Sequence, residues 1–335
     1  MQLAMFKEKQ FGIIIAVAIL VALVVLGNVF PVFFGPSNIL NILSQSSVLA
    51  IMAIGLCFVI VVGGIDLSIV VSFDLGAMVA MLLLKAGIIW PITFVAGLAT
   101  GLLIGLINSF MVVKVKVSPF LTTLGTMLIG QSIEKIVTHG GDSIFISGMP
   151  GFFVFLGRGS VYLKQISEGS MVDFKFSVLL AILLAIVTYF VLCRTIFGRN
   201  LSAVGAQSAA AELSGVSVGR YVTYAFMISG VFSALAGLVA ASVASGFVPM
   251  TGSYYMLDAI GAVFVGSIIS KRKTANIQGT LVGVILFGIV ANALNIAGVH
   301  YYWQNVVRGS LILIVLGFDG ILGKNVLVKK KVAKI

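Results

Sequence analysis

Long apolar segments follow one another along nearly the whole chain, separated by short polar or glycine-containing segments. A helix needs about 20 apolar residues to cross a bilayer. The runs are continuous rather than alternating and exceed the roughly 9–11 residues of a tilted barrel strand, which favours helices over strands. A glycine turn alone separates the second and third segments, which are two helices or one broken element. Ten transmembrane helices are predicted, at residues 11–34, 47–63, 65–84, 88–113, 117–133, 176–193, 221–246, 254–270, 276–299 and 303–320.

The composition supports this all-α, polytopic membrane protein, with a single transmembrane domain over residues 1–335. Apolar and aromatic residues with Cys make up 60% of the chain, and only 9% of residues are charged, against about 25% in an ordinary soluble domain. So few charges cannot cover a water-facing surface. Cys57 and Cys193 both lie inside apolar segments, which argues against a disulfide framework or a metal site.

The positions of Lys and Arg predict the orientation. The chain has 21 of them against 10 Asp and Glu, a net charge of +11. Such an excess can attract nucleic acid, but here the basic residues lie between apolar segments. With the N-terminus in the cytoplasm, 15 of the 21 fall in cytoplasmic segments and 5 outside. Cytoplasmic loops are enriched in Lys and Arg, so both termini are predicted to be cytoplasmic, and the even helix count favours ten.

Two connections are long enough to carry structure of their own. Residues 134–175 are predicted to form an extracytoplasmic loop with a short surface helix, open to an outside partner. Residues 194–220 are predicted to be cytoplasmic, and their alanine-rich part between Ser208 and Gly215 predicts a short capped helix. Such a helix suits docking into another protein's groove, although these residues alone fit an idle surface helix equally well.

A weak internal symmetry relates two parts of the chain. Segment 101–105 begins and ends with glycine and is followed by Asn108; segment 279–283 does the same and is followed later by Asn292. Predicted helices two to five and seven to ten would then be inverted repeats, which are typical of transporters. The alternative is that both are glycine-rich packing helices, since small residues spaced by four let helix backbones approach closely.

A carboxylate lies at the predicted break between the second and third helices, in the segment GGIDLS at residues 63–68. Broken membrane helices expose backbone groups that need partners, and gate or substrate positions often supply them. Asp66 therefore caps the third helix, contributes to a gate, or does both.

Three other carboxylates, Asp74, Asp258 and Asp319, lie in or near predicted helices. Intramembrane carboxylates are costly and usually face the protein interior or water. Asp258 is the strongest functional candidate of the three, although a pairing with Arg308 or a helix cap would also explain it.

Neutral polar side chains gather near the ends of several predicted helices. Hydroxyls and amides suit a path for a polyhydroxylated solute and argue against an ion pump. For any single residue, an interhelical hydrogen bond worth about 0.6 kcal/mol is the more ordinary explanation. The predicted path or gate residues are Asn41, Gln45, Asp66, Ser68, Thr122, Thr123, Thr126, Asp258, Asn292, Asn295, Trp303 and Gln304.

The sequence gives little support for a catalytic function. Both histidines, His139 and His300, are predicted outside the membrane, and neither a His-Glu-x-x-His motif nor a Walker phosphate loop occurs. The chain is therefore predicted to be no enzyme and to hold no metal or cofactor itself, so any ATP-driven transport requires a separate subunit.

Six ordered motifs resemble the permease subunits of bacterial ABC importers for monosaccharides of the ribose and galactose type, which are related to branched-chain amino acid permeases. The resemblance covers nearly the whole chain. The motifs lie at residues 41–55, 63–68, 117–127, 198–215, 255–260 and 298–304. The chain departs from the family's pattern at residues 69–72, 205–207 and 267–276, and the last of these segments lacks the family's glycines.

The resemblance implies an inner-membrane permease that pairs with a second copy or a paralogue. It also implies a cytoplasmic ATPase with two nucleotide-binding domains, which binds ATP and Mg, and an extracytoplasmic sugar-binding protein. Closure of the ATPase would turn the permease outward. The ATPase-coupling residues implied are Ala209, Ala210, Glu212, Leu213 and Gly215.

Other functions stay open at this point. Importers of nucleosides, autoinducer-2 or branched-chain amino acids share the architecture that the resemblance implies. An ion-coupled secondary carrier would use Asp66, Asp74 and Asp258 as coupling groups. An intramembrane enzyme is disfavoured, because no nucleophile and base are evident at membrane depth.

Overall fold

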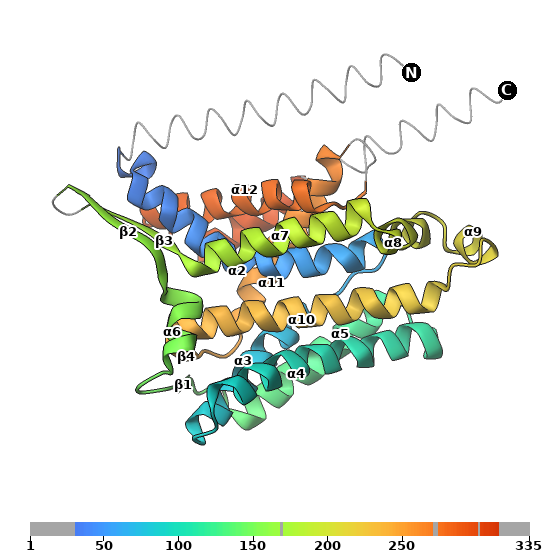
Figure 1. Cartoon of the computed structure of the whole chain (residues 1–335), viewed down its shortest axis with the longest axis horizontal. Coiled ribbons are helices and arrows are strands. Elements are labelled where there is room, and N and C mark those ends of the chain that lie inside the picture. The colour runs from blue at the N-terminus through green and yellow to red at the C-terminus, as the bar shows by residue number, and fades with distance from the viewer. Residues whose placement is uncertain (1–30, 168–169, 271–273, 301, 315–335) are drawn as a thin grey trace, which may run out of the picture.

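The computed structural model describes residues 31–167, 170–270, 274–300 and 302–314. Long helices lie side by side along the molecule (Figure 1). They are α2 (Pro36–Val61), α3 (Ile69–Lys85), α4 (Trp90–Phe110), α5 (Pro119–Val137), α7 (Phe176–Arg194), α10 (Val218–Ala244), α11 (Thr251–Ile269) and α12 (Ile277–Ile296). Residues 302–314 are also helical.

Six helices in the described ranges are long and apolar enough to cross a membrane, namely α2, α4 with its π-helical extension η2 (Met111–Val115), α7, α10, α11 and α12. The protein is therefore a multi-pass membrane protein. Among the other long helices, α3 has only 17 residues, and α5 contains Gln131, Glu134 and Lys135. Residues 11–30 of the predicted helix at 11–34 and the end of the one at 303–320 lie outside the described residues, as does Asp319, so the total of ten and the cytoplasmic termini stay predictions. Residues 31–34 form a 3-10 turn, and α2 begins at Pro36 rather than at the predicted residue 47.

The second and third predicted segments are two separate helices. Residues 62–68 between α2 and α3 are not helical, and Gly63 has φ +84°. Such a positive φ is accessible to glycine at little cost, because glycine has no Cβ. The chain therefore breaks its helical hydrogen bonding at this point and restarts at Ile69.

Short elements occupy the connections. The predicted surface helix in residues 134–175 is confirmed as α6 (Gly151–Arg158), and the short helix predicted in residues 194–220 is confirmed as α9 (Ser208–Leu213), which follows α8 (Ile196–Ala206). The all-α prediction missed two small antiparallel sheets. One pairs β1 (Ile144–Phe145) with β4 (Gly246–Phe247), and the other pairs β2 (Ser160–Ser167) with β3 (Ser170–Lys175). A 3-10 turn, η1 (Pro31–Phe34), precedes α2.

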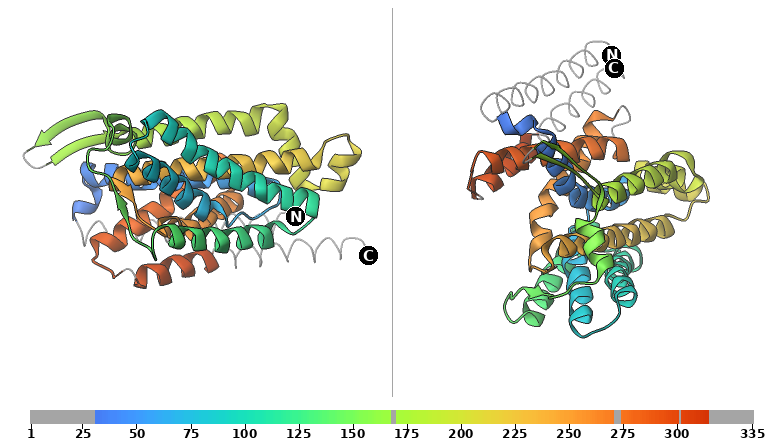
Figure 2. Two further views of the ribbon diagram at one scale, coloured as in Figure 1. Left: turned by 90° about the horizontal axis from the view of Figure 1, so that it is seen from below. Right: turned by 60° about the vertical axis from the view of Figure 1, so that its left-hand side comes forward.

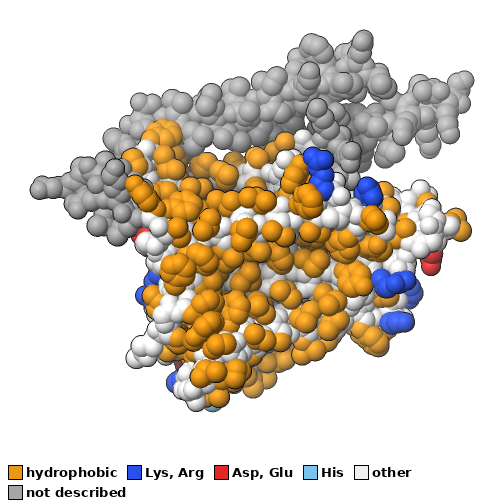
Figure 3. Space-filling model, in the orientation of Figure 1, with side chains coloured by type: hydrophobic (Ala, Val, Ile, Leu, Met, Phe, Trp, Pro, Cys, Tyr) orange, Lys and Arg blue, Asp and Glu red, His pale blue; other side chains and the backbone are white. Residues whose placement is uncertain are grey.

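The two ends of the molecule differ in structure. The β2–β3 hairpin projects at one end, and α8 and α9 lie at the opposite end, in Figure 1 and in the left view of Figure 2. Figure 3 shows a largely hydrophobic face with Lys and Arg gathered toward the end that carries α8 and α9. This gathering fits the orientation predicted from the basic residues, with α8 and α9 on the cytoplasmic side.

Helix α10 lies at the centre and packs against α2, α3 and α4, while α12 packs against α11 and α2. Glycine pairs make these contacts close. A Cβ added at Gly101 of α4 would collide with the carbonyl of Gly230 of α10, and one added at Gly279 of α12 would collide with Gly266 of α11. These stretches therefore do pack tightly, which is compatible with inverted repeats as well as with packing alone.

We expect Gly101→Ala to lower the free energy of unfolding by about 1–3 kcal/mol, the usual cost of overpacking a tight contact. Gly125→Ala is the matched control, because a Cβ at Gly125 meets nothing within 4 Å and alanine favours helix over glycine. Thermal unfolding of the purified protein in detergent measures both. Equal stability of the two variants would contradict the packing role.

Candidate functional site

The connection between α2 and α3 is organised by Asp66, whose side chain is buried. Its Oδ1 accepts hydrogen bonds from the Ser68 N–H at 2.9 Å and the Ser68 hydroxyl at 2.5 Å. Its Oδ2 accepts one from the Ser229 hydroxyl of α10 at 2.7 Å. Ser68, and not Asp66, is the N-cap residue of α3. Asp66 thus stabilises the start of α3 from two residues upstream, and it ties that start to α10.

Two further helices join this network. The Asn108 amide of α4 donates to the Ser68 hydroxyl oxygen at 2.6 Å, and its Oδ1 accepts from the Thr126 hydroxyl of α5 at 2.6 Å. The Thr123 hydroxyl of α5 donates to the backbone carbonyl of Ile65 at 3.2 Å. The structure therefore brings four of the predicted path residues together here, namely Asp66, Ser68, Thr123 and Thr126.

The same connection touches α8, in the segment 194–220. A Cβ at Gly205 of α8 would collide with the carbonyl of Val61 at the end of α2, so the two backbones are in direct contact. Leu201 of α8 is fully buried in a cluster with Phe58 of α2 and Phe226 of α10. Movement of α8 would therefore be transmitted to the ends of both α2 and α10.

Helix α9 projects beyond α8 at the edge of the molecule (Figure 1). The Leu213 side chain is 91% exposed, which is unusual for a large apolar residue, whereas Ala211 is buried. Gly215, with φ +82°, ends this segment in the left-handed region. All five predicted coupling residues, Ala209, Ala210, Glu212, Leu213 and Gly215, are exposed.

A second helix start is held by two buried carboxylates. Asp74 of α3 accepts a hydrogen bond from the Gly252 N–H at 2.8 Å, and Glu134 of α5 accepts one from the Met250 N–H. Met250 is the N-cap residue of α11, with φ +62°. Both carboxylates are fully buried and lie where the positive end of the helix dipole favours an anion. They therefore fix where α11 begins.

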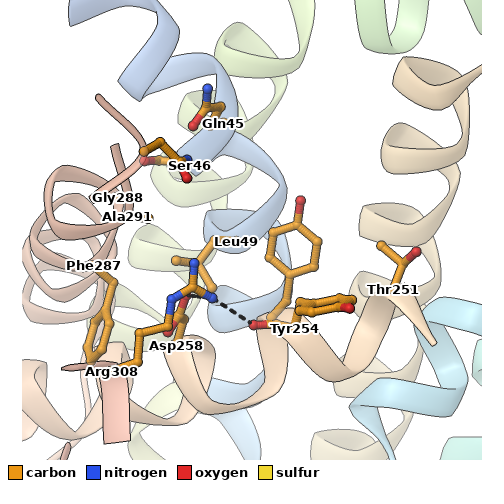
Figure 4. Close-up of a pocket in the computed structure, with 12 residues that line it drawn as sticks. Gln45, Ser46, Leu49, Thr251, Tyr254, Asp258, Phe287, Gly288, Ala291 and Arg308 are labelled. Carbon is orange, nitrogen blue, oxygen red and sulfur yellow. Dashed lines mark hydrogen bonds and ion pairs between the residues drawn. The ribbon is translucent and has the colours of Figure 1, made fainter. Parts of the chain in front are cut away.

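A cavity of about 370 Å³ lies between α2, α11, α12 and residues 302–314. Figure 4 shows Gln45 and Ser46 of α2 on one side, with Asp258 and Arg308 across from them. The Arg308 guanidinium forms an ion pair with Asp258 Oδ2 at 3.2 Å and donates to the Tyr254 carbonyl at 3.4 Å. The pairing with Arg308, which the sequence left open as an alternative role for Asp258, is thus present. Of the predicted path residues, Gln45, Asp258 and Asn295 line this cavity.

The other five predicted path residues belong to neither group, although Gln304 bonds to the cavity residue Asn295 and the Thr122 carbonyl accepts from Thr126. The amides of Asn292 and Asn38 exchange hydrogen bonds of 2.9 and 3.0 Å between α12 and α2. Gln304 donates to Asn295 Oδ1 at 2.9 Å. The remaining three are Asn41 and Trp303, which are exposed, and Thr122, which is buried.

Sequence reasoning left four of these residues out of the predicted site. Asn108 enters the sequence analysis only through the repeat, Ser229 and Ser46 carry no specific sequence signal, and Glu134 falls within the predicted loop at 134–175. In the structure, residues 134–137 belong to α5. A carboxylate within one turn of a helix end is the signal that would have marked Glu134.

Residues 215–219 match the letters of the Gly-x-Ser-x-Gly pattern of hydrolases, but their structure differs from a nucleophile elbow. Such an elbow places the serine between a strand and a helix. Ser217 instead follows the short helix α9 and is the N-cap residue of α10. Within the described ranges, no group of three or more His, Cys, Asp or Glu residues could hold a metal ion.

Comparisons with known proteins place these features in context. Residues 38–316 match the family described as branched-chain amino acid transport system / permease component. The ribose import permease protein RbsC of Haemophilus influenzae is 34% identical over 95% of this chain and 94% of its own length. The galactose/methyl galactoside import permease protein MglC of Escherichia coli K12 is 33% identical over 93% and 94%. RbsC of Bacillus subtilis is 32% identical over 93% and 92%. No solved structure gives a significant match.

We expect Ser229→Ala to destabilise the protein by about 1–3 kcal/mol, because it leaves one oxygen of the buried Asp66 carboxylate without that donor. Ser233→Ala, one turn further along α10, is the matched control. The Ser233 hydroxyl is buried and has no hydrogen-bond partner among the described residues, so its loss should cost little. Thermal unfolding in detergent compares the two, and an equal shift would exclude a role for the Asp66–Ser229 bond.

Proposed function

Because the chain belongs to the family of branched-chain amino acid transport permease components, we propose that it is the membrane subunit of an ATP-driven importer. The solute is a monosaccharide of the ribose or galactose type. One observation carries this proposal: this chain is similar to import permeases for ribose and for galactose, over more than nine tenths of its own length and of theirs. The chain itself is not an enzyme in this scheme, and ATP and Mg are bound by a partner subunit.

Helix α9 is the part that docks on the ATPase. Its exposed apolar Leu213 suits insertion into a groove, where an apolar side chain is removed from water. The adjoining α8 contacts the end of α2 through Gly205. Closure of the two nucleotide-binding domains would push α9 and α8, and the network around Asp66 would pass that displacement to α3, α4, α5 and α10.

The remaining partners follow from the orientation of the chain. An extracytoplasmic sugar-binding protein delivers the solute at the end opposite α9, where the β2–β3 hairpin projects (Figure 1). A second copy or a paralogue completes the path in the inner membrane. Nucleosides and autoinducer-2 are the alternative solutes, and the ligand of the binding protein distinguishes them.

Helices α2–α5 and the segment from α10 to residue 314 form inverted repeats in this proposal. Their contacts correspond pairwise. Helix α3 packs on α4 as α11 packs on α12, and α4 packs on α10 as α12 packs on α2. This correspondence supports the symmetry suggested by the glycine stretches.

An ion-coupled carrier is less well supported. Each of its three proposed coupling groups already has a partner: Ser68 and Ser229 for Asp66, the Gly252 N–H for Asp74, and Arg308 for Asp258. These partners supply structural roles for the buried carboxylates.

Co-purification tests the proposed function. The tagged chain is extracted gently from its native membrane, and the proteins that accompany it are identified by mass spectrometry. We expect an ATPase with a Walker loop, together with an extracytoplasmic protein that binds a monosaccharide. Recovery of the chain with no ATPase would contradict the proposal.

A second prediction concerns α9. Leu213→Asp should lower ATPase recovery and ATP-driven uptake at least about tenfold, because it places a charge in an apolar contact whose loss costs upward of 1.4 kcal/mol. The unfolding temperature of the Leu213→Asp variant should equal that of the wild type, since the Leu213 side chain is exposed. Leu213→Met keeps the apolar contact and is the control. Undiminished uptake by Leu213→Asp would remove Leu213 from the docking surface.

A further inference from the structure

The cavity that contains the Asp258–Arg308 ion pair has unused hydrogen-bonding capacity. Asp258 Oδ1 and Ser46 Oγ are buried and have no hydrogen-bond partner among the described residues. Buried polar groups are normally paired, and both of these residues line the cavity. Two residues that each carry an unpaired polar atom, one on α2 and one on α11, thus line the same cavity.

The lining of the cavity matches the chemistry of a sugar. Asp258 offers an acceptor and Arg308 offers donors, while the amides of Gln45 and Asn295 offer both. Tyr254 and Tyr255 add aromatic faces for the apolar C–H side of a sugar ring. Small-molecule sites commonly have volumes of about 300–1,000 Å³ and combine apolar walls with a few polar groups, and the cavity of about 370 Å³ lies in this range.

The position of the cavity fits a solute that arrives from outside. Its lining residues on α11 lie near the start of that helix, directly after β4. Strand β4 pairs with β1 of the connection at 134–175, so this end of α11 faces away from α8 and α9. A ligand in the cavity would also contact residues 302–314 through Arg308, and it would therefore link α2, α11 and that last helical segment.

We propose that this cavity is a binding subsite for the monosaccharide during transport, a proposal that rests on the importer function above. Asp258 Oδ1 and Ser46 Oγ hydrogen-bond to ring hydroxyls, and the ion pair with Arg308 holds the carboxylate in place. The subsite makes the membrane subunit selective for the hydroxyl pattern of the solute, in addition to any selection by the binding protein.

Analogue discrimination tests the subsite. The full importer, with its ATPase and binding protein, is reconstituted in proteoliposomes. Maximal ATP-driven uptake is measured at saturating loaded binding protein for D-ribose, D-galactose and their 2-, 3- and 4-deoxy analogues. In Asp258→Asn and Ser46→Ala, we expect the uptake ratio of parent sugar to at least one deoxy analogue to change about threefold or more, because a site that pairs a hydroxyl discriminates against its absence.

Ser46→Ala still tests the subsite if Asp258→Asn fails to fold. The Ser46 hydroxyl has no hydrogen-bond partner in the described part of the chain, so its removal should not disturb folding. Ser47→Ala is the matched control, because the Ser47 hydroxyl donates to the Ser44 carbonyl at 2.7 Å, and its ratios should equal those of the wild type. Uniform slowing of all sugars, or unchanged ratios in Ser46→Ala, would overturn the subsite alone. Absence of ATP-driven uptake by the wild-type importer would overturn the importer function, and the subsite with it.

Discussion

The structure depends on one constraint: inside a bilayer, each backbone N–H at a helix break needs a partner within the protein. The chain breaks between α2 and α3 and again between α10 and α11. Buried carboxylates meet the need at both places, with Asp66 accepting from the N–H of Ser68 and Asp74 from that of Gly252. Because side chains of neighbouring helices complete these sites, the breaks also fix how the helices are arranged.

The two helix breaks determine the positions of α8 and of the cavity that Asp258 lines. The α2–α3 break lies against α8, through the contact of Gly205 with Val61, so it joins residues 194–220 to the centre of the bundle. The α10–α11 break sets where α11 begins, and hence where Asp258 and Tyr254 face the cavity. A movement at α9 and a ligand in the cavity therefore act on opposite ends of one helical assembly.

Sequence reasoning located most of the described helices because each is a continuous apolar run, a signal that needs no knowledge of neighbours. It also identified α9 from its composition and the break at Asp66 from its glycines. It could not assign roles to Ser229 or Glu134, because each role depends on a partner that is distant in the sequence. Ser229 bonds to Asp66, which is 163 positions away, and Glu134 bonds to Met250, which is 116 positions away. The β2–β3 hairpin was missed since it lies outside the apolar segments, and the division of the path residues into two groups depends on packing.

The central claim is that the buried carboxylates stabilise the helix breaks and line the proposed sugar subsite, while ATP hydrolysis in a partner drives transport. Radiolabelled sugar uptake into proteoliposomes tests it most directly. The vesicles contain the chain alone under an ion gradient, or the chain with its ATPase and binding protein under ATP. The account predicts uptake only in the second preparation. Uptake by the chain alone, driven by the ion gradient, would contradict it and make the buried carboxylates the coupling groups.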